Sequence, residues 1–172
     1  MVHQKAVMAA VLVLVAIAVG CQTTQRIAGQ ARRMLRPPGE TLETLPERVA
    51  GEYECSRLTR PFARLERTEI VPARVSAGDA VNHRFVYALC TARPTDVVRG
   101  TLETRILHEG RAVVSERDSS YDLKPGRWIV DATVAVPEGA RDGIYAVEIV
   151  FRSRRVHFRD QRTFAVVTPG DG

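Results

Sequence analysis

The sequence predicts an all-β protein, a single antiparallel β-sandwich that follows an N-terminal leader and a linker. From about residue 52 onward, apolar and polar residues alternate with a period of two, the pattern of strands with one buried face. Turn signals separate these runs at regular intervals, which is typical of sandwiches and barrels. No helical repeat is long enough for an α/β fold. A chain of 172 residues with 45% hydrophobic and 26% charged residues fits one ordinary globular domain.

Residues 1–20 have the organisation of a secretory signal peptide. Lys5 supplies a positive start, and residues 6–19 form an apolar run. This run is shorter than the roughly 20 residues that a membrane-spanning helix requires. Small residues follow it, as they do at a signal cleavage site. We therefore expect residues 1–20 to be removed.

The end of the leader, Ala18-Val19-Gly20-Cys21, resembles the lipobox of bacterial lipoproteins. The resemblance implies that the signal is cut before Cys21 and that this cysteine carries acyl chains such as palmitate. Several acyl chains anchor a protein stably to a membrane, whereas one does not. Enteric lipoproteins that stay in the inner membrane have Asp after the cysteine. Gln22 therefore implies the outer membrane, facing the periplasm. The alternatives are an ordinary cleaved signal or an uncleaved anchor, in which Cys21 has no role.

Residues 21–50 are predicted to form a tether between the acylated N-terminus and the domain. They hold few large apolar residues and contain Pro37-Pro38-Gly39. Within them, residues 25–36 carry four arginines, no acid, and apolar residues at helical spacing. This stretch is either a solvated linker or a short helix that lies in the membrane interface with its arginines on lipid phosphates.

The β-sandwich is expected over residues 51–168, with a disordered tail at residues 169–172. Successive strands alternate between apolar and polar positions, and turns rich in Gly and Pro separate them. The predicted strands are a first one near Cys55 and then residues 81–89, 98–107, 112–123, 128–136, 145–151 and 156–166. The turns between the later strands are His108-Glu109-Gly110-Arg111, Lys124-Pro125-Gly126 and a corner at residues 137–143.

The segment over residues 137–147, with a proline-led corner before Gly-Ile-Tyr-Ala-Val, resembles a corner of immunoglobulin-like and fibronectin type III-like sandwiches. In that family it is the E–F corner and the start of strand F. The resemblance implies that the Tyr145 hydroxyl bonds back to the corner backbone. Val147 stands where antibody domains have their second cysteine, and Trp128 falls on strand E rather than on strand C. The domain is therefore not of the antibody type, and a sandwich of six to eight strands with another topology is the alternative.

Two cysteines remain in the predicted domain, Cys55 and Cys90. An even pair in an exported protein favours a disulfide. Such a bridge would tie the first strand to the end of the strand that contains Cys90. The alternative is a pair of free thiols.

The sequence contains little that indicates chemistry. His83, His108 and His157 have no partner at metal-ligand spacing, and His83 falls on an apolar strand face, as a core or edge histidine does. Nucleophile-elbow, phosphate-loop and zinc-protease motifs do not occur. The acidic run at residues 118–122 lacks the glycine and the spacing of a calcium loop. We therefore expect no enzyme activity, no cofactor and no metal.

Cations are expected to gather at one end of the sandwich. The run from residue 151 to residue 162 holds five arginines and one acid. Loops at one end of a sandwich lie together, so two further loops, residues 91–97 and 124–127, should lie beside residues 153–155. The candidate binding residues at this end are Arg93, Lys124, Arg127, Arg152, Arg154 and Arg155. Guanidinium groups match phosphates and carboxylates. The alternative is a solvated edge whose arginines prevent pairing with other strands.

These observations predict a membrane-anchored envelope lipoprotein. Its sandwich would act as a non-enzymatic binding or assembly module for an envelope protein partner. The second hypothesis is an accessory domain that recognises acidic glycan or lipid phosphate through the arginine-rich end. Nucleic acid is not expected as a partner in that compartment. A hydrolase is a third and more remote hypothesis.

Overall fold

The computed structural model describes residues 36–168. The predicted signal peptide, Cys21, the first part of the tether and the tail at residues 169–172 lie outside these residues. The chain divides into two compact units, and the second, Leu35–Gly172, contains the whole folded domain. In the part of the chain that the structure describes, no helix has the length and apolar character needed to cross a membrane.

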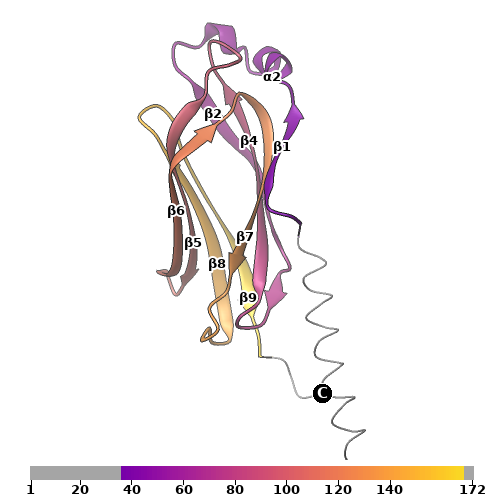
Figure 1. The fold of residues 1–172 in the computed structure, drawn as a ribbon, viewed down its shortest axis with the longest axis vertical. Coiled ribbons are helices and arrows are strands. Elements are labelled where there is room, and N and C mark those ends of the chain that lie inside the picture. The colour runs from indigo at the N-terminus through magenta and orange to yellow at the C-terminus, as the bar shows by residue number, and fades with distance from the viewer. Residues whose placement is uncertain (1–35, 169–172) are drawn as a thin grey trace, which may run out of the picture. The chain divides into compact units, whose positions relative to one another are not determined.

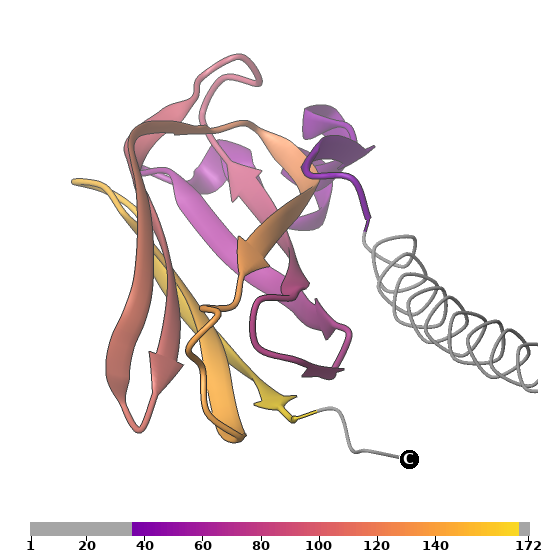
Figure 2. The same cartoon turned by 60° about the horizontal axis from the view of Figure 1, so that its bottom comes forward.

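The domain is a sandwich of two β-sheets (Figures 1 and 2). The first sheet has the order β1-β7-β4-β2, and all its strand pairs are antiparallel. The second has the order β3-β9-β8-β5-β6 and is antiparallel except for the short β3–β9 pair. The strands of the first sheet are β1 (Gly39–Thr44), β2 (Phe62–Val71), β4 (Ala80–Cys90) and β7 (Gly126–Ala135). Those of the second are β3 (Arg74–Val75), β5 (Val98–His108), β6 (Arg111–Leu123), β8 (Gly143–Arg152) and β9 (His157–Val166).

This strand order confirms the predicted all-β, immunoglobulin-like sandwich. The neighbours β2-β4-β7 correspond to strands A, B and E of that fold, and β5-β8-β9 to strands C, F and G. Strand β1 stands beside β7, the place that strand D takes in the family. Trp128 lies on β7, the E strand, as expected. The β5–β6 turn has positive φ at Glu109 and Gly110, the conformation of a two-residue hairpin loop whose twist suits the flanking strands.

The core lies between the two sheets because alternate residues of each strand point inward. Along β4, these are Val81, His83, Phe85, Tyr87 and Leu89, all at most 1% exposed. Phe85, Tyr87 and Leu89 belong to one apolar cluster and Val81 belongs to a second. His83 lies between Val81 and Phe85 along the strand. The period-two pattern therefore identified the buried face of this strand correctly.

The tether is shorter than predicted, because the domain begins before residue 51. Residues 39–44 form β1, which pairs with β7, and Gly39 lies opposite Asp131. The helix α2 (Pro46–Glu52) follows and buries the side chain of Val49 completely. Strand β1 is an edge strand with five polar or small residues out of six, so it lacks the alternation that marks a half-buried strand. A helix of seven residues is likewise too short to show periodicity.

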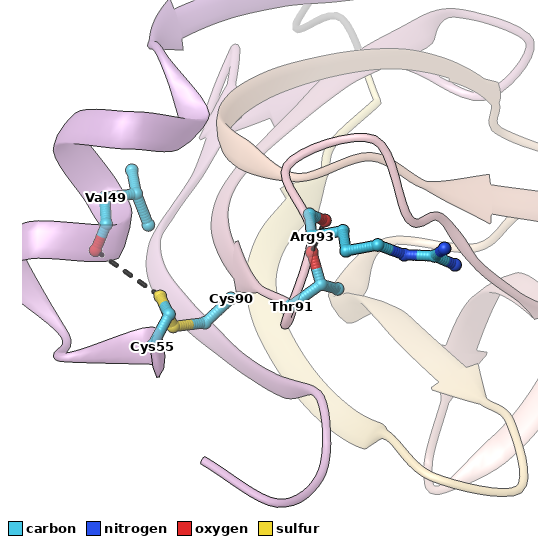
Figure 3. Close-up of a disulfide and its surroundings, with 5 residues drawn as sticks. All are labelled: Val49, Cys55, Cys90, Thr91 and Arg93. Atoms are coloured by element: carbon cyan, nitrogen blue, oxygen red, sulfur yellow. Dashed lines mark hydrogen bonds between the residues drawn. A yellow bond between two sulfur atoms is a disulfide. The ribbon is translucent and has the colours of Figure 1, made fainter. Parts of the chain in front are cut away.

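The predicted disulfide between Cys55 and Cys90 is present, with the two Cα atoms 5.4 Å apart (Figure 3). Cys55 lies in the 3-10 turn η1 (Cys55–Arg57), and Cys90 is the last residue of β4. The bridge therefore ties the segment between α2 and β2 to the end of a central strand. The sequence had predicted that it would join two strands, but Cys55 does not lie on a strand.

Tyr145 forms the corner that the family resemblance implied. Its hydroxyl accepts a hydrogen bond from the backbone N–H of Arg141 at 3.1 Å and donates one to the carbonyl of the same residue at 3.0 Å. Tyr145 is 4% exposed, and its ring stacks on that of His108. The corner between β7 and β8 is thus held to the sandwich by a buried side chain.

Candidate functional site

A cleft of about 670 Å³ opens at one end of the sandwich. Three segments that are distant in the sequence form it: residues 58–61 before β2, residues 91–99, which are the loop after β4 and the start of β5, and the tip of the β8–β9 hairpin at residues 153–155. The loop after β4 and the hairpin tip therefore lie together, as predicted. The lining residues are Leu58, Thr59, Arg60, Pro61, Thr91, Ala92, Thr95, Asp96, Val97, Val98, Arg99, Ser153, Arg154 and Arg155.

The hairpin tip presents two arginines on a fixed backbone. The Ser153 hydroxyl accepts hydrogen bonds from the backbone N–H groups of Arg155, at 3.2 Å, and Val156, at 2.8 Å. The backbone N–H of Ser153 donates to the carbonyl of Val156, which closes the turn. Serine favours such turns because its hydroxyl replaces a missing backbone partner. Val156 is buried, whereas the side chains of Arg154 and Arg155 are exposed.

The wall opposite the hairpin begins next to the disulfide. Residues 58–61 follow Cys55 by a few positions, and the bridge to Cys90 fixes where this segment starts. Cys90 also precedes the 91–97 loop, so one covalent link positions two of the three segments. Figure 3 shows this loop, with Thr91 and Arg93, leaving from the bridged end of β4. The Thr91 hydroxyl donates to the carbonyl of Arg93 at 2.7 Å, which shapes the loop locally.

Three arginines at the cleft have no carboxylate within ion-pair distance among residues 36–168: Arg60, Arg154 and Arg155. The fourth lining arginine, Arg99, binds both oxygens of Asp122 at 2.8 Å. The one lining carboxylate, Asp96, pairs with the guanidinium of Arg93. Since these two pairs cancel, the uncompensated charge at the cleft is positive and comes from the three unpaired arginines.

Lys124, Arg127 and Arg152 do not belong to this group, contrary to the prediction that they form one free cationic end. Lys124 pairs with Glu40 and lies over the ring of Trp128. Arg152 lies 3.7 Å from Glu103. Arg93 sits in the predicted loop, yet its charge is matched by Asp96. Of the six predicted binding residues, Arg154 and Arg155 therefore remain as free cations at the cleft.

Arg127 is a structural residue on the outer face of the first sheet. It alternates with the inward-facing Trp128 along β7, so its side chain meets Glu66 of β2 at 2.6 Å and Glu52 of α2 at 2.8 Å. Its side chain is only 16% exposed. Burial raises the pKa of Glu66, but hydrogen bonds from Arg127 and Tyr53 outweigh this and leave that pKa below its usual value. The cluster joins β7, α2 and β2.

Arg60 and Arg99 are the cleft arginines that the sequence did not indicate as site residues. Arg60 is about 30 residues before the 91–97 loop and more than 90 before the hairpin tip. No local pattern marks it, because its position depends on the disulfide and on the pairing of β2 with β4. Arg99 opens β5 on an exposed strand face and reads as an ordinary solvated residue.

Residues that could carry chemistry are dispersed in the described part of the chain. No group of three or more His, Cys, Asp or Glu side chains lies close enough to hold a metal ion there. His83 is fully buried in the core, where desolvation lowers its pKa to about 4. Asp118 accepts hydrogen bonds from the backbone N–H and the hydroxyl of Ser120, within an irregular stretch of the β5–β6 pairing.

Comparison with known proteins assigns no family to the chain. No known protein family and no curated protein matches the chain. Similar solved structures include the Pseudomonas fluorescens alkylpurine DNA glycosylase AlkC bound to DNA with an abasic site analog. It is 11% identical over 62% of this chain and 30% of that chain, with a TM-score of 0.43. The Bacillus subtilis sporulation control protein Spo0M is 14% identical over 64% of this chain and 49% of that chain, with a TM-score of 0.41. A Clostridium perfringens family 123 glycoside hydrolase is 12% identical over 64% of this chain and 28% of that chain, with a TM-score of 0.43. The chain spans less than half of each of these proteins.

Proposed function

We propose that the protein is a membrane-anchored envelope lipoprotein whose sandwich is a non-enzymatic binding or assembly module. Its contact surface is the cleft between residues 58–61, the 91–97 loop and the β8–β9 hairpin tip. The observation that carries this proposal is the group of three arginines at a cleft with a fixed backbone, none of which has an ion pair among residues 36–168. Loops held by a rigid scaffold are where binding residues concentrate.

The functional groups of the cleft support binding rather than catalysis. They are guanidinium groups, threonine and serine hydroxyls, and the carboxylate of Asp96, which Arg93 holds in an ion pair. Acyl or glycosyl transfer requires a nucleophile next to a base, or two facing carboxyl groups. Guanidinium groups instead recognise anions through paired N–H donors.

The anchor in this proposal is acylated Cys21, at the end of the signal peptide. About 15 residues join it to the start of the described domain at Arg36, and a chain of that length reaches at most roughly 50 Å. The domain would therefore work within that distance of the membrane. We place it at the outer membrane, facing the periplasm.

Metabolic labelling with palmitate tests the anchor. The wild-type protein is expected to incorporate the label and to fractionate with membranes. Cys21→Ser is expected to lose the label, and Cys55→Ser serves as a control because its cysteine lies within the domain. Continued labelling of the Cys21→Ser protein would show that the anchor is assigned wrongly.

In-cell crosslinking tests the binding surface. A photoreactive residue in place of Thr95, in the cleft lining, is expected to capture an envelope partner. The same residue in place of Ser119, which is exposed on β6 outside the cleft lining, is the matched control. If both positions yield the same products with the same efficiency, the cleft is not the contact surface.

A second candidate function, recognition of an acidic glycan or a lipid phosphate, is favoured by the same arginines. Binding of this kind is expected to weaken steeply with salt because it depends on exposed charges. Protein capture through a packed interface is expected to resist salt. Repeating the capture at low and high ionic strength separates the two candidates.

A further inference from the structure

We propose that the cleft end of the domain docks on an anionic phospholipid surface. Arg60, Arg154 and Arg155 would bind lipid phosphates, while Leu58 and Val97 enter the membrane interface. This inference rests on the proposed binding role of the cleft and names its ligand as the phosphate-bearing head group of a membrane lipid.

The charge at the cleft supplies the first argument. The three arginines come from two chain segments and stand without carboxylate partners among the described residues. Many other arginines of the domain are held by acids, as Arg127 is by Glu66 and Arg84 is by Asp131. Further exposed arginines outside the cleft also lack an ion pair among the described residues, but they do not line the cleft: Arg74 lies on β3, and Arg111 and Arg117 lie on β6. An unpaired guanidinium binds two oxygens of a phosphate with little loss of side-chain freedom for each bond. Several such groups on one surface favour a ligand with many phosphates, and a membrane surface is one.

The apolar side chains of the cleft supply the second argument. Leu58 and Val97 are 38% and 49% exposed, and both line the cleft that the arginines border. Pro61 and Ala92 continue this aliphatic lining. Large apolar side chains beside cations are the combination found on segments that lie in the membrane interface, with the cations at the phosphate level and the apolar groups below. A free acidic glycan would leave these aliphatic groups without a suitable partner.

The rigidity of the cleft supplies the third argument. The hydrogen bonds of Ser153 hold the hairpin tip, and the disulfide holds the start of the two other segments. Docking therefore fixes few additional rotatable bonds of the cleft segments, and less of the interaction free energy is lost to conformational entropy. A surface that is already shaped can use three arginines and two apolar side chains efficiently. The proposed acyl anchor would add to this by keeping the lipid surface nearby.

Vesicle flotation tests the proposal. The chain Leu35–Gly172 is suitable, because this compact unit contains both sheets, both core clusters and the disulfide. The probes are vesicles of phosphatidylcholine alone and vesicles with one third phosphatidylglycerol, at low ionic strength. We expect the protein to float with the anionic vesicles and to remain behind with the neutral ones.

Two sets of variants localise the binding. Arg60→Gln, Arg154→Gln and Arg155→Gln combined are expected to weaken partitioning by about 100-fold, since each arginine near an anionic surface contributes about fivefold. The control combines Arg74→Gln, Arg111→Gln and Arg117→Gln, three exposed arginines outside the cleft with the same change in net charge. It is expected to keep most of the binding. Melting curves of both triple variants establish that they are folded.

Three results would overturn the proposal. They are absence of flotation with anionic vesicles, equal loss in the two triple variants, and unchanged binding when Leu58→Ser and Val97→Ser are combined. Inorganic phosphate and an acidic polysaccharide serve as competitors. If the polysaccharide is bound and the vesicles are not, the ligand is a glycan. If phosphate at the same concentration as the lipid displaces the protein fully, the site takes free phosphate instead. Palmitate labelling of Cys21 and the Thr95 crosslinks are independent of these results, so the proposed function can stand when this inference fails.

Discussion

A drop in pH from about 7 to about 5 is expected to destabilise the folded domain by about 2 kcal/mol through one core side chain, His83. His83 points inward from β4, is fully buried, and lies 6.2 Å from the ring of Phe85 between ring centroids. Neither ring nitrogen has a hydrogen-bond partner in the described structure. The charged groups that act on the imidazole are Asp160 and Arg162, both on β9 of the opposite sheet. The folded domain therefore holds this imidazole neutral.

The magnitude follows from the two pKa values of His83. Desolvation is the main cause that lowers its pKa from 6.5 to about 4 in the folded domain, while Asp160 raises it and Arg162 lowers it by smaller amounts. Because the folded pKa lies below the unfolded one, the unfolded chain binds more protons between these values. The stability is complete above about pH 6.5 and is lost as the pH falls toward 4. The full loss is about 3 kcal/mol, at about 1.4 kcal/mol for each pH unit between the two pKa values, and about 2 of it falls between pH 7 and 5.

Urea denaturation at the two pH values, followed by Trp128 fluorescence, measures this effect. The wild-type domain is compared with His83→Leu, which keeps the apolar volume and removes the titrating group. His157→Gln is the control, because His157 is exposed on β9. The range from pH 7 to 5 also lies above the range in which carboxyl groups with a lowered pKa affect stability. A hydrogen bond from Arg105 lowers the pKa of Glu103 from 4.5 to about 2, so the stability that Glu103 contributes is lost only below about pH 4.5.

We expect the wild-type and His157→Gln domains to lose about 2 kcal/mol between pH 7 and 5, and His83→Leu to lose little. If His83→Leu loses as much stability as the wild type, then another group titrates in this window and the assignment to His83 is wrong.

Three further predictions concern stability. Replacing Cys55 and Cys90 together by alanine is expected to lower the free energy of unfolding by about 4 kcal/mol, given their separation of 35 residues; a change below 1 kcal/mol in urea denaturation would contradict the chain-entropy argument. Tyr145→Phe removes two buried hydrogen bonds and should cost about 1–2 kcal/mol in the same assay, whereas an unchanged midpoint would show that the corner holds without the hydroxyl. Arg127→Gln should cost about 1–3 kcal/mol because it leaves Glu66 partly buried without its main partner, while Arg154→Gln should stay within about 0.5 kcal/mol; equal effects of the two would refute the division into structural and free arginines.

The strands of the core were predictable because their alternation is a local property. In β4, every second residue from Val81 to Leu89 is apolar or aromatic except His83, and this is the face that packs against the other sheet. The turn at Glu109-Gly110 was recognisable for the same reason, since a glycine after a polar residue suits the positive φ of a tight hairpin. The corner before Tyr145 carried its own local motif.

The first strand and the helix after it were not predictable from such patterns. Strand β1 lies at a sheet edge and has polar residues on both faces, so nothing in its composition distinguishes it from a linker. Its pairing with β7 depends on residues almost 90 positions away. The single buried side chain of α2, Val49, is likewise invisible without knowledge of what it packs against.

The arginine-rich end shows the same division most clearly. The loops at residues 91–97 and 153–155 meet as predicted, because strand order alone brings these connections to one end. Pairing of charges, in contrast, depends on which acids stand opposite in space. Arg127 meets Glu66 from another strand, and Arg60 and Arg154 line the same cleft.

The sequence by itself determined the all-β class, the core face of the main strands, the hairpin turns, the tyrosine corner and the cysteine pair. These features follow from the chemistry of neighbouring residues or from a simple count. Only the tertiary structure decided which arginines are neutralised and which stand free at the cleft. Ion pairs such as Arg127–Glu66 and Arg99–Asp122 join side chains that the chain separates by tens of residues. That proximity exists only once the strands have paired and packed.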